Sequence, residues 1–258
     1  MTITKALINL QPAESKKLIA VGITALDSIK EKMQEGRIFV SRGTTNAYVL
    51  EEMMAIAEFD KNRYVAGEVV SEGERLWAVP SEKRLPEILF TDGQPAEVNS
   101  ISDALEVMEK GDIILKGANA LDPQGIAGVL LAHPKGGTCG AFWGTLRAQG
   151  LHLVIPIGLE KLVVHSILYT SQELGIEEVD LADGYPTGLF PLFGEVFTEI
   201  EALQTLFNLE VLHIASGGVG GGEGSVTLLL IGEQAVVTKA FDFCQKMKTI
   251  EPFTPIIK

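Results

Sequence analysis

Cysteine is scarce in this sequence, with two residues in 258, Cys139 and Cys244. They stand far apart and belong to no pair with metal-ligand spacing, which argues against a disulfide framework and against a zinc site. The four histidines also lack metal-ligand or HExxH spacing, and no GxSxG elbow occurs. The sequence therefore predicts no metal site, no cofactor and no hydrolase triad.

Positive charge and long apolar runs are also lacking. The chain has 21 Lys and Arg against 34 Asp and Glu, a net charge of −13, and no basic stripe that could follow a phosphate backbone. No apolar run is long enough to cross a bilayer, and the N-terminus lacks the pattern of a signal peptide. We therefore expect no nucleic-acid partner, no membrane partner and a cytoplasmic location.

Apolar residues, by contrast, make up 46% of the chain, enough to fill a large core. Short apolar or β-rich runs alternate with stretches of helical spacing or propensity. This alternation predicts an α/β fold, with a mostly parallel sheet covered by helices. The runs expected to be strands are 37–40, 112–117 and 151–158, and those expected to be helices are 12–36, 47–59, 101–111, 137–150 and 159–175.

The chain changes character near residues 183–194, where prolines and glycines indicate a linker. The segments that follow suggest a strand and helix, two strands and a last helix, a split βαβ unit of ferredoxin-like type. We therefore predict an α/β domain at 1–185 and a small ferredoxin-like α+β domain at 186–258. Exposed strands of such a small domain can pair across a two-fold axis, which predicts a homo-oligomer.

A loop with the residues Gly43, Thr44, Thr45 and Asn46 separates the first predicted strand of the sheet from a helix. Loops at the carboxyl ends of parallel strands meet at one edge, where ligands bind. Glycine allows close approach, Thr and Asn side chains donate hydrogen bonds, and a helix N-terminus attracts anions. The loop predicts a phosphate or carboxylate site, although a capped turn without a ligand could have the same sequence. It matches neither GxGxxG nor a Walker loop.

A second glycine-rich turn, residues 135–140, leads into another predicted helix. Lys135 supplies a point charge, and the successive backbone amides behind it suit a phosphate or an oxyanion. The alternative is a surface lysine beside a flexible turn. Cys139 could gain nucleophilicity at the helix N-terminus or be a small, half-buried thiol. The candidate ligand-binding residues of this turn are Gly136, Gly137, Thr138 and Gly140.

Polar residues after two further strands are expected at the same sheet edge. Lys116, Asn119 and Asp122 combine a cation, an amide and a carboxylate, which could orient a polyhydroxy or acyl substrate. Asp122 could instead start a turn before the proline that follows it. Glu160 begins a predicted helix, where it could reach the cleft or simply favour the helix dipole.

The order of these features resembles the superfamily of ribose-5-phosphate isomerases, glucosamine-6-phosphate deaminases and CoA transferases. The resemblance covers roughly residues 30–180 and runs through "RGTTNA", "DIILKGANALD", "KGGTCGAF" and "VIPIGLEKLV". It implies that residues 43–46 bind a sugar phosphate and that Lys135 matches the lysine of the family's KGGGGA motif. A ferredoxin-like second domain is also similar to the isomerase arrangement.

The chain departs from the isomerases at their catalytic acids. Residues 116–119, Lys-Gly-Ala-Asn, replace both acids of the family's DGAD motif, and Gly144 stands where the isomerase has its glutamate base. Loss of a general base removes roughly 10²- to 10⁴-fold in rate, so we predict that the chain is not a ribose-5-phosphate isomerase. The glutamate nucleophile of the CoA transferases has no clear counterpart either.

The sequence thus predicts a cleft for a sugar phosphate, a nucleotide or a CoA ester. In an isomerase or transferase, Lys135 and Lys116 would stabilise charge, and Asp122 or Glu160 would act as acid or base. The alternative is a non-catalytic metabolite sensor or a regulatory or assembly subunit, because the superfamily is also similar to sugar sensors and to regulatory subunits of translation factors. The missing carboxylates favour the alternative, whereas the retained lysine and the intact loops favour an enzyme.

Overall fold

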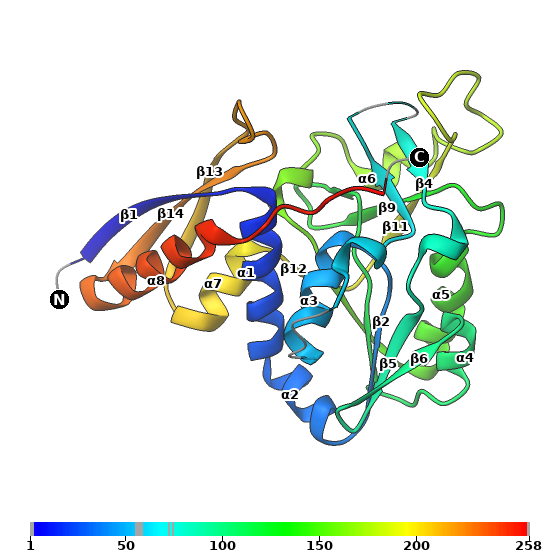
Figure 1. Ribbon diagram of the computed structural model, residues 1–258, viewed down its shortest axis with the longest axis horizontal. Coiled ribbons are helices and arrows are strands. Elements are labelled where there is room, and N and C mark those ends of the chain that lie inside the picture. Colours follow the sequence, from blue (N-terminus) through cyan, green and yellow to red (C-terminus); the bar gives the residue numbers. More distant parts are fainter. Residues whose placement is uncertain (1–2, 55–58, 72, 74, 257–258) are drawn as a thin grey trace.

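The protein is an elongated α/β molecule with a large body at one end and a small antiparallel sheet at the other (Figure 1). The computed structural model describes residues 3–54, 59–71, 73 and 75–256. Within these ranges, no helix combines the length and the apolar character needed to cross a membrane. The predicted α/β class is confirmed.

The large body is built on a six-stranded sheet in the order β12-β10-β7-β2-β5-β6. The first four strands are parallel, whereas β5 and β6 join antiparallel, so the sheet is mixed. A two-residue turn with positive φ at Asp92 and Gly93 connects β5 to β6, and such a hairpin allows only antiparallel pairing. The strands are β12 (Glu195–Phe197), β10 (His152–Pro156), β7 (Ile113–Leu115), β2 (Arg37–Val40), β5 (Glu87–Thr91) and β6 (Gln94–Val98).

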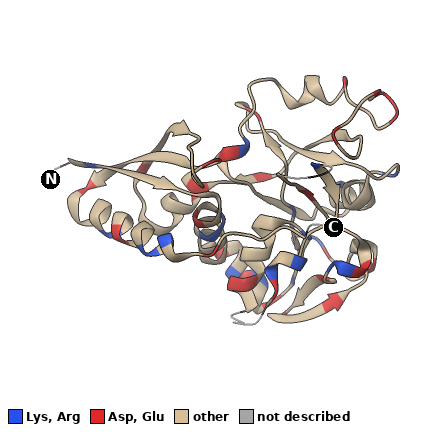
Figure 2. Cartoon of the chain, turned by 45° about the horizontal axis from the view of Figure 1, so that its top comes forward, with Lys and Arg blue, Asp and Glu red and all other residues tan. Residues whose placement is uncertain are grey.

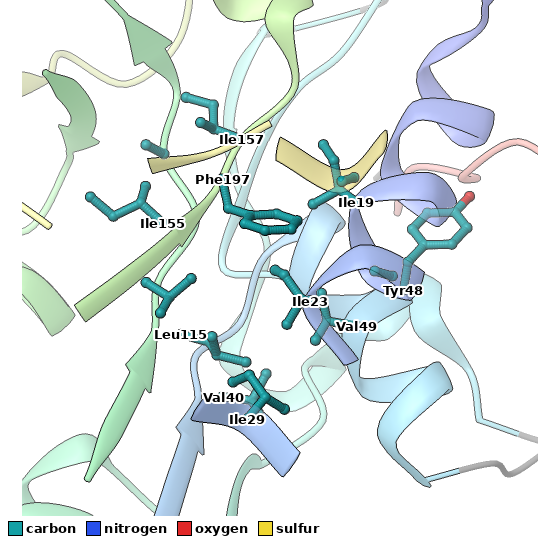
Figure 3. Close-up of a cluster of buried hydrophobic side chains, with 14 of the residues drawn as sticks. Ile19, Ile23, Ile29, Val40, Tyr48, Val49, Leu115, Ile155, Ile157 and Phe197 are labelled. Carbon is teal, nitrogen blue, oxygen red and sulfur yellow. The ribbon is translucent and has the colours of Figure 1, made fainter. Parts of the chain in front are cut away.

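Helices cover both faces of this sheet (Figure 1). On one face lie α1 (Pro12–Ala25), α2 (Asp27–Gln34) and α3 (Thr44–Met54); on the other lie α4 (Ile101–Leu105) and α5 (Gly137–Gln149). Figure 3 shows Ile19 and Ile23 of α1 and Val49 of α3 facing Leu115 and Ile155 of the sheet. All five are fully buried, and each such side chain contributes about 1.5–3 kcal/mol relative to exposure. The helical spacing of apolar residues in 12–36 therefore marks a face that packs in the core. The single helix predicted there is divided into two, α1 and α2.

The small sheet has three antiparallel strands, β1 (Ile3–Leu10), β14 (Val226–Glu233) and β13 (Glu210–Ser216). The helices α7 (Glu199–Phe207) and α8 (Gln234–Lys246) lie beside it (Figure 1). Two of its strands come from the predicted C-terminal unit, whereas β1 comes from the opposite end of the chain. The first strand predicted for that unit, β12, pairs instead with β10 of the main sheet, because Phe197 is buried in the main core.

The stretch expected to be a linker contains β11 (Gly188–Leu192), which pairs with β9 (Ala127–Leu131). β9 also pairs with β8 (Ala120–Leu121) and completes a second three-stranded antiparallel sheet. The strands β3 (Gly67–Val69) and β4 (Leu76–Ala78) form a separate two-stranded antiparallel sheet. Short 3₁₀ helices at Lys61–Arg63 and Ser81–Lys83 come before β3 and after β4, and another at Met247–Thr249 follows α8.

The long helix predicted for residues 159–175 is absent from this described part of the chain. The segment forms a 3₁₀ turn, η3 (Leu159–Lys161), and the short helix α6 (Ile167–Thr170). Backbone amides that a continuous helix would use internally donate elsewhere, Val163 N–H to Leu121 O at 2.8 Å and Ile167 N–H to Oδ2 of Asp122 at 2.9 Å. Tertiary hydrogen bonds thus replaced the helical ones.

The C-terminal segment, residues 250–256, runs from the end of α8 back across the large body (Figure 1). The Tyr48 hydroxyl of α3 donates to Glu251 O at 3.1 Å, and Thr254 N–H donates to Oδ1 of Asn62 at 2.9 Å. This segment therefore ties the small sheet region to the large body.

Candidate functional site

Loops that follow three neighbouring parallel strands meet in one pocket, named here the strand-end pocket. Its volume is about 460 Å³, within the range of small-molecule sites. Residues 42–45 follow β2, residues 116–119 follow β7, and Lys161 lies after β10. The start of α5, the end of β9 and the β3–β4 hairpin complete the lining, together with Arg84, Tyr185 and Thr187.

The first predicted loop reaches the pocket through Gly43, Thr44 and Thr45, at the N-terminus of α3. Thr45 is 2% exposed, and its hydroxyl has no hydrogen-bond partner among the described residues. A buried polar group without a partner costs about 1–3 kcal/mol. The Thr45 hydroxyl thus keeps an unused hydrogen-bond donor in a residue that lines the pocket.

Asn46 lies in the same loop but outside the lining. Its side chain is completely buried, and Nδ2 donates to Ser41 O at 2.9 Å and to Leu115 O at 3.0 Å. These bonds fasten the start of α3 to the ends of β2 and β7. Asn46 thus positions the loop that carries Thr44 and Thr45.

The second glycine-rich turn also reaches the pocket, through Gly136, Gly137 and Thr138 at the N-terminus of α5. Gly136 caps the helix with φ of +75°, a left-handed conformation that favours glycine. Lys135 is exposed and lies outside the lining. Gly140 also lies outside it, packed so closely on Lys135 O that any side chain would clash.

Cys139, in the same turn, is 1% exposed at the pocket. Burial raises the pKa of its thiol, and the opposing effect of the Lys116 charge is smaller. The thiol is therefore not activated as a nucleophile.

Four cationic side chains line the pocket, although acidic residues are spread over many elements of the chain (Figure 2). Each is held by a hydrogen bond to a backbone carbonyl oxygen, which limits its rotamer freedom. The bonds run from Nε of Arg42 to Leu85 O (2.7 Å), Nε of Arg84 to Val79 O (2.6 Å), Nζ of Lys116 to Gly117 O (2.9 Å) and Nζ of Lys161 to Ala118 O (2.7 Å). The pocket thus concentrates positive charge in an acidic chain.

Two glutamates accompany these cations. Glu68 lines the pocket, and burial raises the pKa of its carboxyl, opposed by a hydrogen bond from Ile256 N–H. Glu87 is 4% exposed and accepts a hydrogen bond of 3.3 Å from Arg42 N–H. Burial raises the pKa of Glu87 as well, against the nearby positive charges of Arg42, Lys116 and Arg84. Two carboxyl groups whose pKa values are raised do not neutralise the positive charge of the four cationic side chains.

A charged cluster lies at the ends of β10 and β12. Glu199 follows β12, is completely buried, and accepts a hydrogen bond of 3.0 Å from Leu159 N–H. Burial and the neighbouring charge of Glu160 raise the pKa of Glu199 to about 7. Glu160 itself lies outside the lining and pairs with Lys16, with 3.6 Å between Oε1 and Nζ.

Of the two predicted site residues Asp122 and Asn119, only Asn119 lines the pocket. The Asp122 carboxylate is 1% exposed, lies outside the lining, and accepts hydrogen bonds from the backbone N–H groups of Gln124, Ile126 and Ile167. It therefore organises a turn, which was the alternative predicted for Asp122. Asn119 does line the pocket, and its Oδ1 accepts a hydrogen bond of 3.0 Å from Leu130 N–H.

Several pocket residues were not predicted from the sequence. Arg42 and Lys161 each stand next to a residue that was selected, Gly43 and Glu160, so their positions after strands were the available signal. Glu199, which lies outside the lining, follows Thr198, the cap of α7, where acidic residues of a first helical turn are common, so it gave no signal. Arg84 had no signal, since it comes from a connection far from any strand end of the parallel set.

Comparisons of the chain with protein-family models, curated proteins and solved structures found no match. Within the described residues, no three His, Cys, Asp or Glu side chains come together as a group that could hold a metal ion. The fold and the site thus define an α/β protein with a cationic pocket at the carboxyl ends of its parallel strands.

Proposed function

We propose that the protein binds a phosphorylated or otherwise anionic small molecule in the strand-end pocket. The observation that carries the proposal is the convergence of two helix N-termini and four cationic side chains on one pocket of a chain with a net charge of −13. First-turn amides and the helix dipole favour an anion at each N-terminus. Dispersed acidic charge gives no such preference elsewhere on the surface.

The unpartnered hydroxyl of Thr45 supports the same proposal independently. It is buried at the N-terminus of α3 and lines the pocket, where an anionic oxygen would accept its hydrogen bond. A phosphate offers several such oxygens at once. We therefore propose a sugar phosphate, a nucleotide or a CoA ester as the ligand class, in keeping with the resemblance to sugar-phosphate isomerases and CoA transferases.

A second candidate function is binding without turnover, as in a metabolite sensor or a regulatory subunit. It is favoured by the positions of Asp122 and Glu160, the carboxylates considered as acid or base. Asp122 is occupied by three backbone amides and Glu160 is paired with Lys16, and neither lines the pocket. If an isomerase or transferase activity exists, its proton transfers need other groups.

A thermal-shift titration tests the binding proposal. Inorganic phosphate, and then sugar phosphates, nucleotides and CoA esters, should raise the melting temperature, by about 1.4 kcal/mol of stabilisation at ten times the dissociation constant. Lys116→Met should weaken binding about tenfold by removing a charged donor from the pocket. Lys135→Met is the matched control, because Lys135 is exposed and outside the lining.

The proposal fails if no anion stabilises the protein, or if the Lys116 and Lys135 variants lose binding equally. Product analysis with the ligand that binds most tightly then separates the two candidate functions. Turnover supports an enzyme, and its absence at saturating ligand supports a sensor.

A further inference from the structure

We propose that Lys161 is the reactive amine of the strand-end pocket and forms an imine with an aldehyde or ketone group of the anionic ligand. This inference rests on the proposed function, because the other cations of the pocket would hold the anionic part of that ligand. It adds a substrate class, anionic carbonyl compounds, and a covalent role for one residue.

The position of Lys161 suits a nucleophile better than an ion-pair partner. It lies in η3, after the carboxyl end of β10, and lines the pocket beside the loop that carries Lys116. Its Nζ donates a hydrogen bond of 2.7 Å to Ala118 O, which orients the amine without supplying a negative charge. Within the described part of the chain Lys161 takes part in no ion pair.

Lys17 shows how ion pairs with carboxylates change the pKa of a lysine in this chain. Lys17 lies against both Glu51 and Glu52, and its pKa is raised because these carboxylates outweigh its burial. Glu160, the carboxylate next to Lys161 in sequence, pairs with Lys16 instead. Lys161 is thus left half-buried, with an amine whose hydrogen-bond partner is uncharged.

The charges around Lys161 come from four elements. Glu160 of η3 and Glu199 of α7 favour its charged form, whereas Lys16 of α1 and Lys116 after β7 oppose it. Burial is the largest influence, and together these lower the pKa of Lys161 to about 8. At pH 7 about one such amine in ten is neutral, about 300-fold more than for an ordinary lysine. Desolvation and neighbouring cations are the known means of activating a lysine nucleophile.

The chemical step needs no further reactant. The neutral Nζ adds its lone pair to the carbonyl carbon, and the carbonyl π electrons move to oxygen, giving a carbinolamine. Loss of water then forms the C=N bond, and the former carbonyl oxygen leaves with the two hydrogens of the amine. No atom is oxidised or reduced, and water reverses the reaction. Pocket cations stabilise the developing negative charge on oxygen during addition.

Pyridoxal 5′-phosphate is a suitable probe because it carries an aldehyde and a phosphate in one small molecule. The protein is incubated with less than one equivalent, the imine is reduced with borohydride, and the labelled lysine is identified by peptide mass spectrometry. We expect most of the label on Lys161, a labelling rate that rises with pH to a midpoint near the pKa of about 8, and protection by inorganic phosphate.

Two variants sharpen the experiment. Lys161→Met should lose the label while its circular dichroism stays unchanged, and Lys239→Met, at an exposed position of α8, should be labelled like the wild type. If Lys161→Met does not fold, the inference is tested on the wild type alone, by the peptide that carries the label and by the pH dependence of the labelling rate. Label on Lys116 or scattered over surface lysines overturns the inference, even if phosphate binds and the proposed function stands. Label on Lys161 that phosphate does not reduce supports the reactive amine and contradicts the anion site.

Discussion

The backbone N–H of Ile256 donates a hydrogen bond of 3.2 Å to Oε2 of Glu68, across 188 positions of sequence. Glu68 lines the strand-end pocket, so the C-terminal segment touches one wall of the candidate site. Burial raises the pKa of this carboxyl, and the Ile256 N–H partly offsets that effect. The segment therefore influences the charge of a carboxyl that lines the pocket.

The first prediction concerns that carboxyl. Glu68→Gln keeps an oxygen that can accept the Ile256 hydrogen bond but removes negative charge from the lining, so binding of inorganic phosphate should tighten about three- to tenfold. Isothermal titration calorimetry measures the change. Glu97→Gln, at an exposed position of β6, is the control and should leave affinity as it is. Equal or weaker binding by the Glu68 variant would contradict a pocket selective for anions.

The second prediction concerns pH and Glu199. Its folded-state pKa of about 7 lies above the value of 4.5 expected for an unfolded chain, so the folded state binds more protons between these values. The contribution of Glu199 to the free energy of unfolding is therefore greatest below pH 4.5. It is lost as the pH rises from 4.5 through 7, by about 3 kcal/mol in total.

Glu199→Gln should remove this dependence. The variant should gain stability relative to the wild type as pH rises from 5 to 7.5, measured by urea unfolding at each pH. Lys161 contributes little in this window, since a lowered lysine pKa of about 8 changes the slope mainly at higher pH. Glu106→Gln, at an exposed position, should follow the wild type. Parallel curves for wild type and Glu199→Gln would refute the raised pKa.

The third prediction compares two helical glycines. A Cβ atom on Gly22 of α1 would lie 2.6 Å from Cβ of Ala202 in α7, so Gly22→Ala forces the two helices apart. Overpacking of this kind costs about 1–3 kcal/mol. Gly144→Ala in α5 meets no atom within 4 Å and should instead stabilise the protein by about 0.5–1 kcal/mol. Thermal unfolding of both variants decides, and a neutral Gly22→Ala would show that α1 and α7 do not pack this closely.

Local patterns predicted the unit of strand, loop and helix around Thr44 and Thr45. A buried strand and one face of a helix can both be recognised from the spacing of apolar residues over a short stretch of sequence. They also predicted the two glycine-rich turns that reach the pocket. The roles of individual side chains were harder to predict, as Asn46 and Asp122 show. Each has the right chemistry for a ligand, yet backbone groups of the protein itself occupy both.

Long-range pairing could not be predicted from local patterns. Residues 159–175 have helical propensity, but the loop around Asp122 offers competing hydrogen-bond partners that only the folded chain brings near. In the same way, the β-rich run of β12 gives no sign of whether it pairs with β10 or with β13. Arg84 reaches the pocket through such a tertiary arrangement. The domain division at residue 185 stays a prediction.

β1 has consequences for how the chain acquires its structure. Ile3 pairs with Glu233 and Leu10 with Val226, so this strand has no sheet partner until residues 226–233 have been synthesised. During translation its apolar residues would remain open to chaperones or to other nascent chains, while the large body can already collapse around its own strands. Closure of the small sheet is therefore a late event, and the kinetics of folding should depend on when β14 leaves the ribosome.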